Sequence, residues 1–231
     1  MRRRDALFLP GLAGSLTLAG LGGGRARAAT ESRLWFIFLE AGQPTPADPA
    51  AVAAMQRGHL DNFKRLFAQG VLLAAGPLLD PGRRQRGIVV VRAATRDELL
   101  AHFAPDAYVR DGYLRVNAVP TEVRRALNTE GIDPEGIEEL RIVQLGRGAT
   151  PADGATDAAR QALLQGLLDQ GVFGAWYTLA EGPVAHVLFA PGTDSAALEA
   201  TLAPYPGLGS DGVSLAVWRQ WLGKGVLRRP A

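Results

Sequence analysis

The sequence predicts an α+β fold made of two tandem units with the same order of elements. Apolar runs and capped amphipathic segments alternate as βαββαβ within residues 32–120 and again within residues 138–223. Gln69–Val71 matches Gln170–Val172 at a spacing of about 100 residues. The βαββαβ order is the ferredoxin-like pattern, which covers one face of its sheet with helices and leaves the other face for a partner. We therefore expect the two sheets to pack face to face within one chain.

The first unit opens with a strand and a long helix. Leu34–Leu39 is apolar at each position, which indicates a strand that is covered on both faces. Asp48 as N-cap and Pro49 at the first helical position begin a helix that ends before Gly70. Turn and capping signals predict the other elements: a hairpin of 71–79 and 87–91, a helix opened by the capping box at 95–98, and a strand at 114–119.

The second unit repeats this order with weaker likeness. Asp211-Gly212 occupies the place of Asp111-Gly112, and Thr156 is expected to cap the long helix. The expected elements are a strand at 140–145, a helix to Gln170, a hairpin of 172–179 and 184–190, a helix at 194–202 and a strand at 213–222. Residues 121–137, rich in charge, are expected to form the linker, and residues 224–231 a tail.

Residues 1–28 have the features of an export signal. Arg2–Arg4 precede a weakly apolar run, and Ala26-Arg27-Ala28 fits an A-x-A cleavage site. The pair Arg3-Arg4 slightly favours the twin-arginine route over general secretion. An uncleaved anchor is the alternative, but Pro10 and several glycines interrupt a run already shorter than the ~20 residues that a spanning helix needs. The sequence therefore predicts a periplasmic or secreted protein without stable membrane anchoring once the signal is removed.

Charge and cysteine content exclude several classes of partner and site. Removing the signal takes five of the 25 basic and one of the 23 acidic residues, which leaves 20 and 22 and a formal net charge of −2. No basic run with interleaved aromatic residues remains, so we expect no nucleic-acid partner. Without cysteine the chain has no disulfide and no thiolate metal site. Three dispersed histidines also lack the spacing of metal ligands, so we expect no metal.

His59 is the leading candidate for a functional residue. It falls on the apolar series 52, 55, 59, 63 and 66 of the first long helix, so its imidazole should point at the sheet. A buried imidazole needs a hydrogen-bond partner, and Asp106, after the second helix, can approach it over the end of the sheet. Such a pair can act as general base and acid. The alternative is a satisfied core histidine, with Asp106 only capping a turn.

Five short segments between residues 34 and 120 carry a family resemblance: Arg57–Leu60, Gly76–Leu78, Arg86–Val89, Pro105–Val109 and Asp111–Leu114. They make this region similar to the YciI-like (YCII-related) family. The resemblance implies a fold of the dimeric α+β barrel type, here within one chain, and a helix-borne histidine paired with an aspartate, matched by His59 and Asp106. The family pattern has Asp-Pro in that loop, whereas this chain has Pro105-Asp106-Ala107, which alters the loop geometry.

The resemblance and the residues together suggest a cofactor-independent lyase or isomerase type of enzyme, acting by proton transfer, isomerisation or elimination on a small molecule. No phosphate-binding loop is present. The alternative is a small-ligand binder or a structural protein without catalysis. Haem is a further alternative, because other families of paired ferredoxin-like sheets carry it on one histidine. We expect a monomer that is itself a pseudo-dimer, or a homodimer.

Four more residues are candidates for binding substrate near the histidine. Gly76 and Pro77 are expected to form a bulge that admits a ligand, or alternatively a bend that ends the strand pairing, and Asp80 and Arg86 are expected to line the mouth of the pocket. The alternative for Asp80 and Arg86 is an ordinary role at a turn or sheet edge. In the second unit Arg160 takes the place of His59, so that unit is expected to have lost the site or to offer Arg160 as a weak anion-binding group.

Overall fold

A computed structural model describes residues 32–210 and 212–227. The expected export signal at 1–28 lies outside the described residues, as do Asp211 and residues 228–231 of the expected tail. No helix within the described ranges is long and apolar enough to cross a membrane.

The described chain contains eight strands and five helices in two halves. The first half runs β1 (Arg33–Ala41), α1 (Pro49–Ala68), β2 (Leu72–Leu79), β3 (Gln85–Ala93), α2 (Arg96–Phe103), α3 (Ala107–Arg110) and β4 (Leu114–Arg125). The second half runs β5 (Asp133–Gly146), α4 (Gly154–Asp169), β6 (Ala175–Leu179), β7 (Val184–Ala190), α5 (Ser195–Leu202) and β8 (Leu215–Lys224). The α+β class is confirmed, and α3 is an addition that the sequence did not predict.

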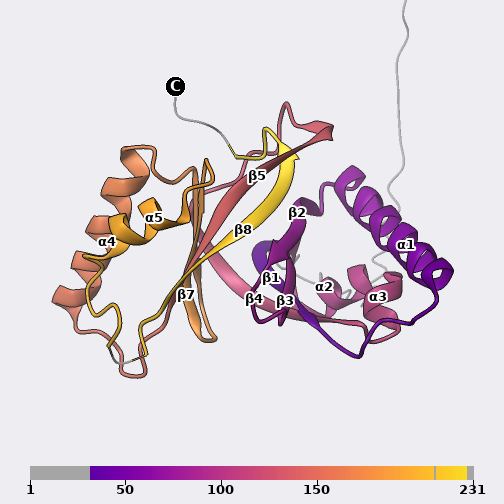
Figure 1. Ribbon diagram of the computed structural model, residues 1–231, viewed down its shortest axis with the longest axis horizontal. Helices are drawn as coiled ribbons and strands as arrows, with labels where there is room; N and C mark the ends of the chain where they lie inside the picture. The colour runs from indigo at the N-terminus through magenta and orange to yellow at the C-terminus, as the bar shows by residue number, and fades with distance from the viewer. Residues whose placement is uncertain (1–31, 211, 228–231) are drawn as a thin grey trace, which may run out of the picture.

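The eight strands form one closed barrel in the order β1-β3-β2-β8-β5-β7-β6-β4. Each half supplies four adjacent strands, and the halves are joined along two seams, β2 with β8 and β4 with β6. The expected face-to-face packing therefore needs refinement, because the two sheets also hydrogen-bond edge to edge. Figure 1 shows α1, α2 and α3 on one side of the barrel and α4 and α5 on the other.

The core has three apolar layers, one inside the barrel and one under the helices of each half. The barrel interior draws residues from both halves, among them Phe36, Ile88, Ile142 and Phe189. The layer under α1 and α2 contains the other face of β1, including Trp35 and Ile37. Both faces of β1 are thus buried, which explains why Leu34–Leu39 is apolar at each position and confirms the doubly covered strand.

Several element ends differ from the expected ones. Asp48 caps α1 by accepting from the Ala50 N–H, as predicted, but Thr156 is not the cap of α4. Asp153 takes that role and accepts from the backbone N–H of Thr156, which lies inside the helix. A carboxylate directly before the first helical residue, Gly154, is a better acceptor for these N–H groups than a threonine inside the helix.

The expected linker is largely strand. Residues 121–125 extend β4 and pair with β6, while Asp133 and Ile137 of β5 pair with β8. β6 belongs to the other half, so the pairing of residues 121–125 depends on closure of the barrel, whereas β5 and β8 both belong to the second half. Only a short connection between β4 and β5 remains outside the strands.

Candidate functional site

The structure brings His59 and Asp106 together. His59 lies on α1 and Asp106 caps the short helix α3, and the two helices pack side by side. His59 Nδ1 lies 2.6 Å from Asp106 Oδ2. The Asp106 side chain is fully buried, whereas 13% of the His59 side chain remains exposed. A buried carboxylate thus holds one ring nitrogen of a partly accessible imidazole.

Asp106 both caps a helix and contacts the histidine. Its Oδ1 accepts from the backbone N–H groups of Tyr108 at 3.0 Å and Val109 at 3.4 Å, while its Oδ2 faces His59. The backbone N–H of Asp106 donates to the Phe103 carbonyl at 2.9 Å. The turn-capping role and the pairing role are therefore compatible, and the cap fixes the carboxylate for its contact with His59.

This contact determines which nitrogen of His59 is available. A carboxylate only accepts hydrogen bonds, so Nδ1 carries the proton and donates it to Asp106. Nε2 has no hydrogen-bond partner among the residues that the structure describes. In the neutral ring Nε2 is then an acceptor, and it is the atom that can take a proton or bind a ligand.

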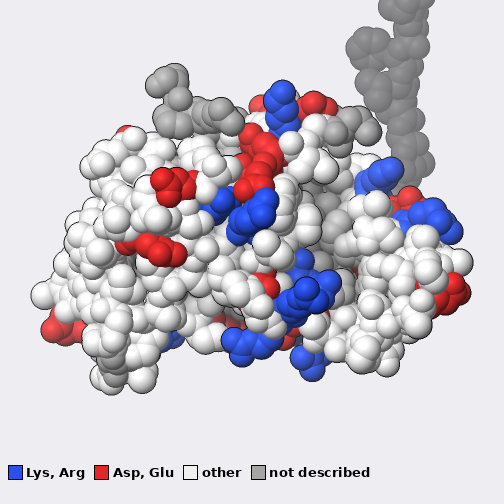
Figure 2. Space-filling model, viewed as in Figure 1, with Lys and Arg blue, Asp and Glu red and all other residues white. Residues whose placement is uncertain are grey.

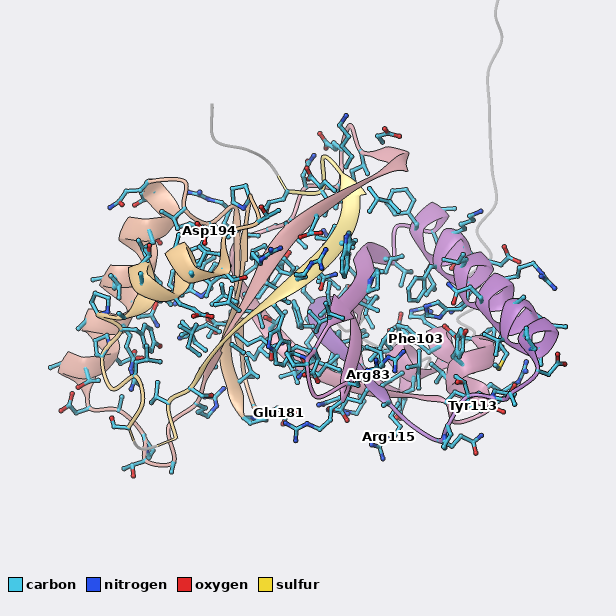
Figure 3. All side chains as sticks on the ribbon, viewed as in Figure 1. Arg83, Phe103, Tyr113, Arg115, Glu181 and Asp194 are labelled. Atoms are coloured by element: carbon cyan, nitrogen blue, oxygen red, sulfur yellow. The ribbon has the colours of Figure 1, made fainter. Side chains whose placement is uncertain are left out.

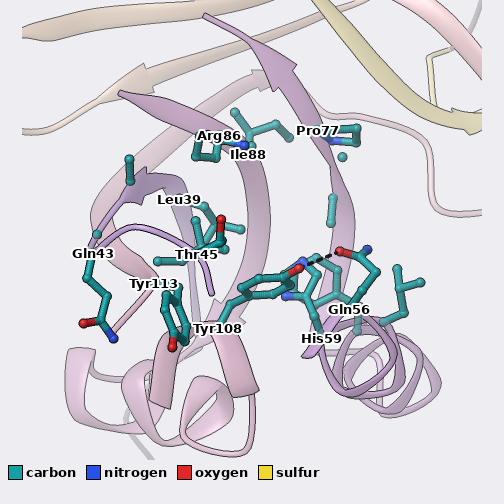
Figure 4. A pocket seen from close by; sticks show the side chains of 18 of the residues that line it. Leu39, Gln43, Thr45, Gln56, His59, Pro77, Arg86, Ile88, Tyr108 and Tyr113 are labelled. Atoms are coloured by element: carbon teal, nitrogen blue, oxygen red, sulfur yellow. Dashed lines mark hydrogen bonds between the residues drawn. The ribbon is translucent and has the colours of Figure 1, made fainter. Parts of the chain in front are cut away.

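His59 lies in the wall of a cavity of about 610 Å³. The cavity is bounded by α1, the start of α3, the loop after β1, and facing parts of β2 and β3, as Figure 4 shows. The Phe63 ring packs 4.2 Å from the imidazole, and the Tyr108 ring meets it edge-on at 5.5 Å. A cavity of this size and mixed lining is typical of small-molecule sites.

Three of the four other candidate residues line the cavity. Gly76, Pro77 and Arg86 belong to its wall, but Asp80 does not. The Asp80 carboxylate is turned into its own hairpin, where it accepts from the backbone N–H groups of Gly82, Arg84 and Gln85. Burial opposes ionisation of Asp80, but these three hydrogen bonds outweigh it and lower the pKa of the carboxyl below its usual value. Asp80 thus stabilises the turn, and it was wrongly expected at the pocket mouth.

The glycine of Gly76-Pro77 has a packing role. A Cβ on Gly76 would lie 1.8 Å from the Trp221 carbonyl oxygen and 2.9 Å from Gln220 Nε2, both on β8. The expected bulge at this position is absent, because Gly76 and Pro77 pair regularly with β3, and the irregularity of β2 lies between Leu72 and Ala74. The small residue therefore permits close approach of β8, and Gly76 also lines the ligand cavity.

The candidate of the second half is engaged elsewhere. Arg160 donates from Nε to the Pro206 carbonyl at 3.0 Å, and its guanidinium lies over the Tyr205 ring at 5.4 Å. Arg160 thus holds the loop after α5. The alignment of the two units, which gives Arg160 the place of His59, could not reveal this contact, because Tyr205 and Pro206 are 45 or more positions away in the sequence.

The two other histidines lie away from the cavity. His186 is buried beside Trp176 and Thr178, whose Nε1 and Oγ1 each lie 3.2 Å from its Nδ1. Burial lowers the pKa of His186 to about 4. His102 is in the last turn of α2. Within the described residues no group of three or more histidine, cysteine, aspartate or glutamate side chains could hold a metal ion.

Sequence reasoning missed several lining residues. Tyr108 and Tyr113 contribute phenol groups, and Gln56 lies one turn before His59 on α1. The Tyr108 hydroxyl donates to Gln56 Oε1 at 3.3 Å. The helical spacing of three could have identified Gln56. The loop after β1 gave no signal, and it is held in place by Gln43, which donates to backbone oxygens of Asp111 and Gly112.

Comparisons with known proteins concern both the sequence and the fold. Residues 36–121 match the model of the YCII-related domain, and a search of curated proteins finds no match. A candidate monooxygenase from Fusobacterium nucleatum superposes with a TM-score of 0.50 at 9% identity, over 86% of this chain and 98% of its own. One from Lactobacillus acidophilus gives 0.48 at 10% identity, over 87% and 100%. A heme-binding protein from Thermus thermophilus gives 0.44 at 12% identity, over 84% and 93%.

At such low sequence identity the comparison shows a likeness of fold alone. The Fusobacterium structure shows this likeness over both halves of the chain. The family match is more local. His59, Asp106 and all the cavity-lining residues fall within 36–121. The match to the YCII-related domain therefore covers most of the first half of this chain, and the matched residues contain the whole candidate site.

Proposed function

We propose that this protein is a small-molecule enzyme in which His59 acts as general base and acid and Asp106 orients it. One observation carries the proposal: His59 Nδ1 is held 2.6 Å from a fully buried carboxylate, while Nε2 is left without a protein partner in the wall of a cavity of about 610 Å³. Fixing one nitrogen by a carboxylate sets the tautomer and makes the other nitrogen a directed proton acceptor.

The arrangement suits proton transfer at carbon. Nε2 takes a proton from a carbon next to a carbonyl group, and the resulting imidazolium is stabilised by the negative charge of Asp106. Return of that proton to a different carbon completes an isomerisation. If the carbanion instead expels a leaving group with its bonding electrons, the proton passes to water and the reaction is an elimination. Neither course needs a cofactor, and both match the type of chemistry that the family resemblance implies.

Proton exchange in heavy water tests this proposal directly. The full chain would be incubated in D₂O with lactones, phenols and small carboxylic acids, and deuterium incorporation followed by NMR. We expect wild type to exchange a proton of at least one compound and His59→Ala to lose that exchange. His102→Ala is the matched control, because His102 lies outside the cavity. Melting temperatures of all three proteins show whether any loss follows from unfolding.

Two other outcomes would favour other functions. A compound that raises the melting temperature of wild type but not of His59→Ala, with no exchange or turnover, would favour ligand binding without catalysis. If His59→Ala melts several degrees lower and no compound shifts either protein, His59 serves core packing and the enzyme proposal fails.

Haem needs its own test, because histidines that ligate metals commonly donate their other N–H to a carboxylate. Among the cavity-lining residues His59 is the one histidine, and its Nε2 would be the ligating atom. Titration with hemin separates the two proposals. A shift of the Soret band that His59→Ala abolishes would favour a haem site and contradict the cofactor-independent reaction.

We also infer that the two halves are copies of one βαββαβ unit. Their strands follow equivalent orders, β4-β1-β3-β2 and β8-β5-β7-β6. Both long helices end alike, with Gly70 and Gly171 at positive φ of 69° and 74°. A crystal structure that fails to superpose the halves strand by strand would contradict this inference.

An offset of 101 residues, set by Gly70 and Gly171, explains the loss of the site in the second copy. Ala75 then corresponds to Trp176, and the cross-strand pair Pro77 with Gly87 corresponds to Thr178 with His186. The second copy thus has large buried side chains where the first copy lines its cavity with small residues. These side chains support a structural role for the second half.

We further propose that residues 1–28 direct export and are removed. The support is the sequence pattern alone, with Arg3-Arg4 ahead of the apolar run and Ala26-Arg27-Ala28 at its end. Mass spectrometry of the protein recovered from its native cells should give an N-terminus at Ala29. An intact N-terminus would contradict cleavage.

A further inference from the structure

We propose that the ligand of this cavity carries one carboxylate, or an equivalent anionic oxygen group, and that Arg86 selects for it. The inference rests on the proposed function, in that it takes the same cavity as the ligand site, and it adds the substrate class. It follows from the distribution of charge around the cavity and does not depend on catalysis.

Among the cavity-lining residues Arg86 is the one group with a permanent charge, and no aspartate or glutamate lines the wall. The remaining lining is apolar or neutral and polar, apart from His59. A guanidinium presents several N–H donors in a plane, which matches the two oxygens of a carboxylate. A neutral cavity with a single cation at its wall therefore favours a singly anionic ligand.

The carboxylates near the site already have partners of their own. Asp106 is bonded to His59, and Asp80 to the backbone of its hairpin. Glu40 accepts from Asn117 Nδ2 at 2.7 Å, and Asp111 accepts from Arg110 at 2.7 and 2.8 Å. No described residue gives the Arg86 side chain a hydrogen bond or an ion pair. Its charge is therefore available to a ligand.

Other cations lie next to Arg86 in the chain. Arg83 and Arg84 precede it in the hairpin between β2 and β3. Figure 2 shows basic side chains gathered near the centre of one face, in the region where Figure 3 labels Arg83 and Arg115. Several like charges near the cavity raise the local concentration of anions. The surroundings thus add attraction to the specific contact at Arg86.

The positions of Arg86 and His59 give the bound ligand a direction. In Figure 4 Arg86 lies in the upper part of the view and His59 in the lower part, and both line the cavity. Apolar side chains, among them Leu39, Phe63 and Ile88, line it as well. A carboxylate placed at Arg86 would let an apolar or aromatic body extend along this wall and bring a more distant carbon of the ligand to His59 Nε2. Charge and reaction centre would thus lie at different ends of the molecule.

Matched pairs of probes test the inference by binding alone. Benzoate and benzamide have nearly the same shape and differ in charge, and phenylacetate and cyclohexanecarboxylate vary the body. Affinities would be measured by NMR titration of the full chain. We expect wild type to bind benzoate about tenfold more tightly than benzamide, since charge-assisted hydrogen bonds are roughly twice as strong as neutral ones. Arg86→Gln should lose this preference while its affinity for benzamide stays unchanged.

Arg92→Gln is the matched control, because Arg92 is an exposed arginine of the same strand that does not line the cavity. We expect it to behave as wild type. The inference is wrong if benzoate has no advantage over benzamide, if Arg92→Gln loses the preference as much as Arg86→Gln, or if none of the three carboxylates binds. Equal loss in Arg92→Gln and Arg86→Gln would show that the preference for benzoate arises from the overall positive charge of the surface.

The enzyme proposal can fail separately. A benzoate preference that persists in His59→Asn, together with no proton exchange by wild type, would leave the anion site standing and remove catalysis. If wild type instead exchanges protons of neutral lactones but shows no preference for carboxylates, the enzyme proposal stands and the anion site is ruled out.

Discussion

Replacing Gly76 with alanine should destabilise the barrel through a clash between backbones. The added Cβ would lie 1.8 Å from the Trp221 carbonyl oxygen, whereas such atoms pack at about 3.5 Å. Relief requires β2 and β8 to separate by roughly 1.5 Å, which exceeds the range of backbone hydrogen-bond distances. The seam between these strands has only two residue pairs, Leu78 with Gln220 and Leu79 with Arg219. Loss of that seam would open the barrel.

Overpacking costs typically 1–3 kcal/mol, and a clash with backbone falls at the upper end, about 3 kcal/mol. For a chain of this size that corresponds to a fall in melting temperature of about 6–12 °C. Urea unfolding followed by circular dichroism gives the free energy of unfolding. Gly166→Ala is the control, because Gly166 lies inside α4 with nothing within 4 Å of its Cβ position. That change should stabilise by roughly 0.5–1 kcal/mol.

The two substitutions therefore have opposite expected signs. If Gly76→Ala is as stable as wild type and instead blocks ligand binding, the glycine serves to admit the ligand and the packing argument is refuted. If both variants lose stability equally, the effect does not arise from the seam between β2 and β8.

Two further predictions concern buried polar groups. Burial lowers the pKa of His186 to about 4, below its unfolded value of about 6.5, so the unfolded chain binds more protons between these values and stability falls as pH drops from 6.5 toward 4, by up to roughly 3 kcal/mol. Urea unfolding at several pH values should show a flatter profile in His186→Gln but not in His102→Gln, and equal profiles would contradict this origin. Asp106→Asn should keep most of the stability but reverse the tautomer of His59, because its one oxygen can cap the Tyr108 N–H while its amide donates to Nδ1. Nitrogen-15 NMR of the imidazole measures this, and an unchanged tautomer would show that Asp106 does not set it.

The sequence was sufficient for features that depend on neighbouring residues. The run Leu34–Leu39 predicted a strand buried on both faces, and Asp48 with Pro49 predicted the start of α1. The seams that close the barrel could not be predicted in this way, because edge strands pair through backbone groups that leave no mark on side chains. Residues 121–125 therefore looked like a linker, although they pair with β6.

The candidate site shows the same division. Helical periodicity placed His59 on the sheet side of α1, and the resemblance supplied Asp106 as its partner at a separation of 47 residues. Asp80 looked equally suited to a pocket, but a carboxylate beside Pro81-Gly82 can satisfy three N–H groups of its own turn, and that local solution prevails. The reason for Gly76 lies on β8, far along the chain, so no local pattern could reveal it.

The second half shapes the site although none of the cavity-lining residues comes from it. Its strand β8 lies directly behind Gly76, and its side chains complete the barrel interior shared with β1 and β3. Without it, β2 and β4 would be open edges, which invite pairing with other chains. Under the proposed duplication, selection on the second half can thus act on closure of the barrel alone. Large side chains such as Trp176 can then occupy the place in the second half that corresponds to the cavity of the first half. This adds packing to the core of the second half and leaves the site in the first half unchanged.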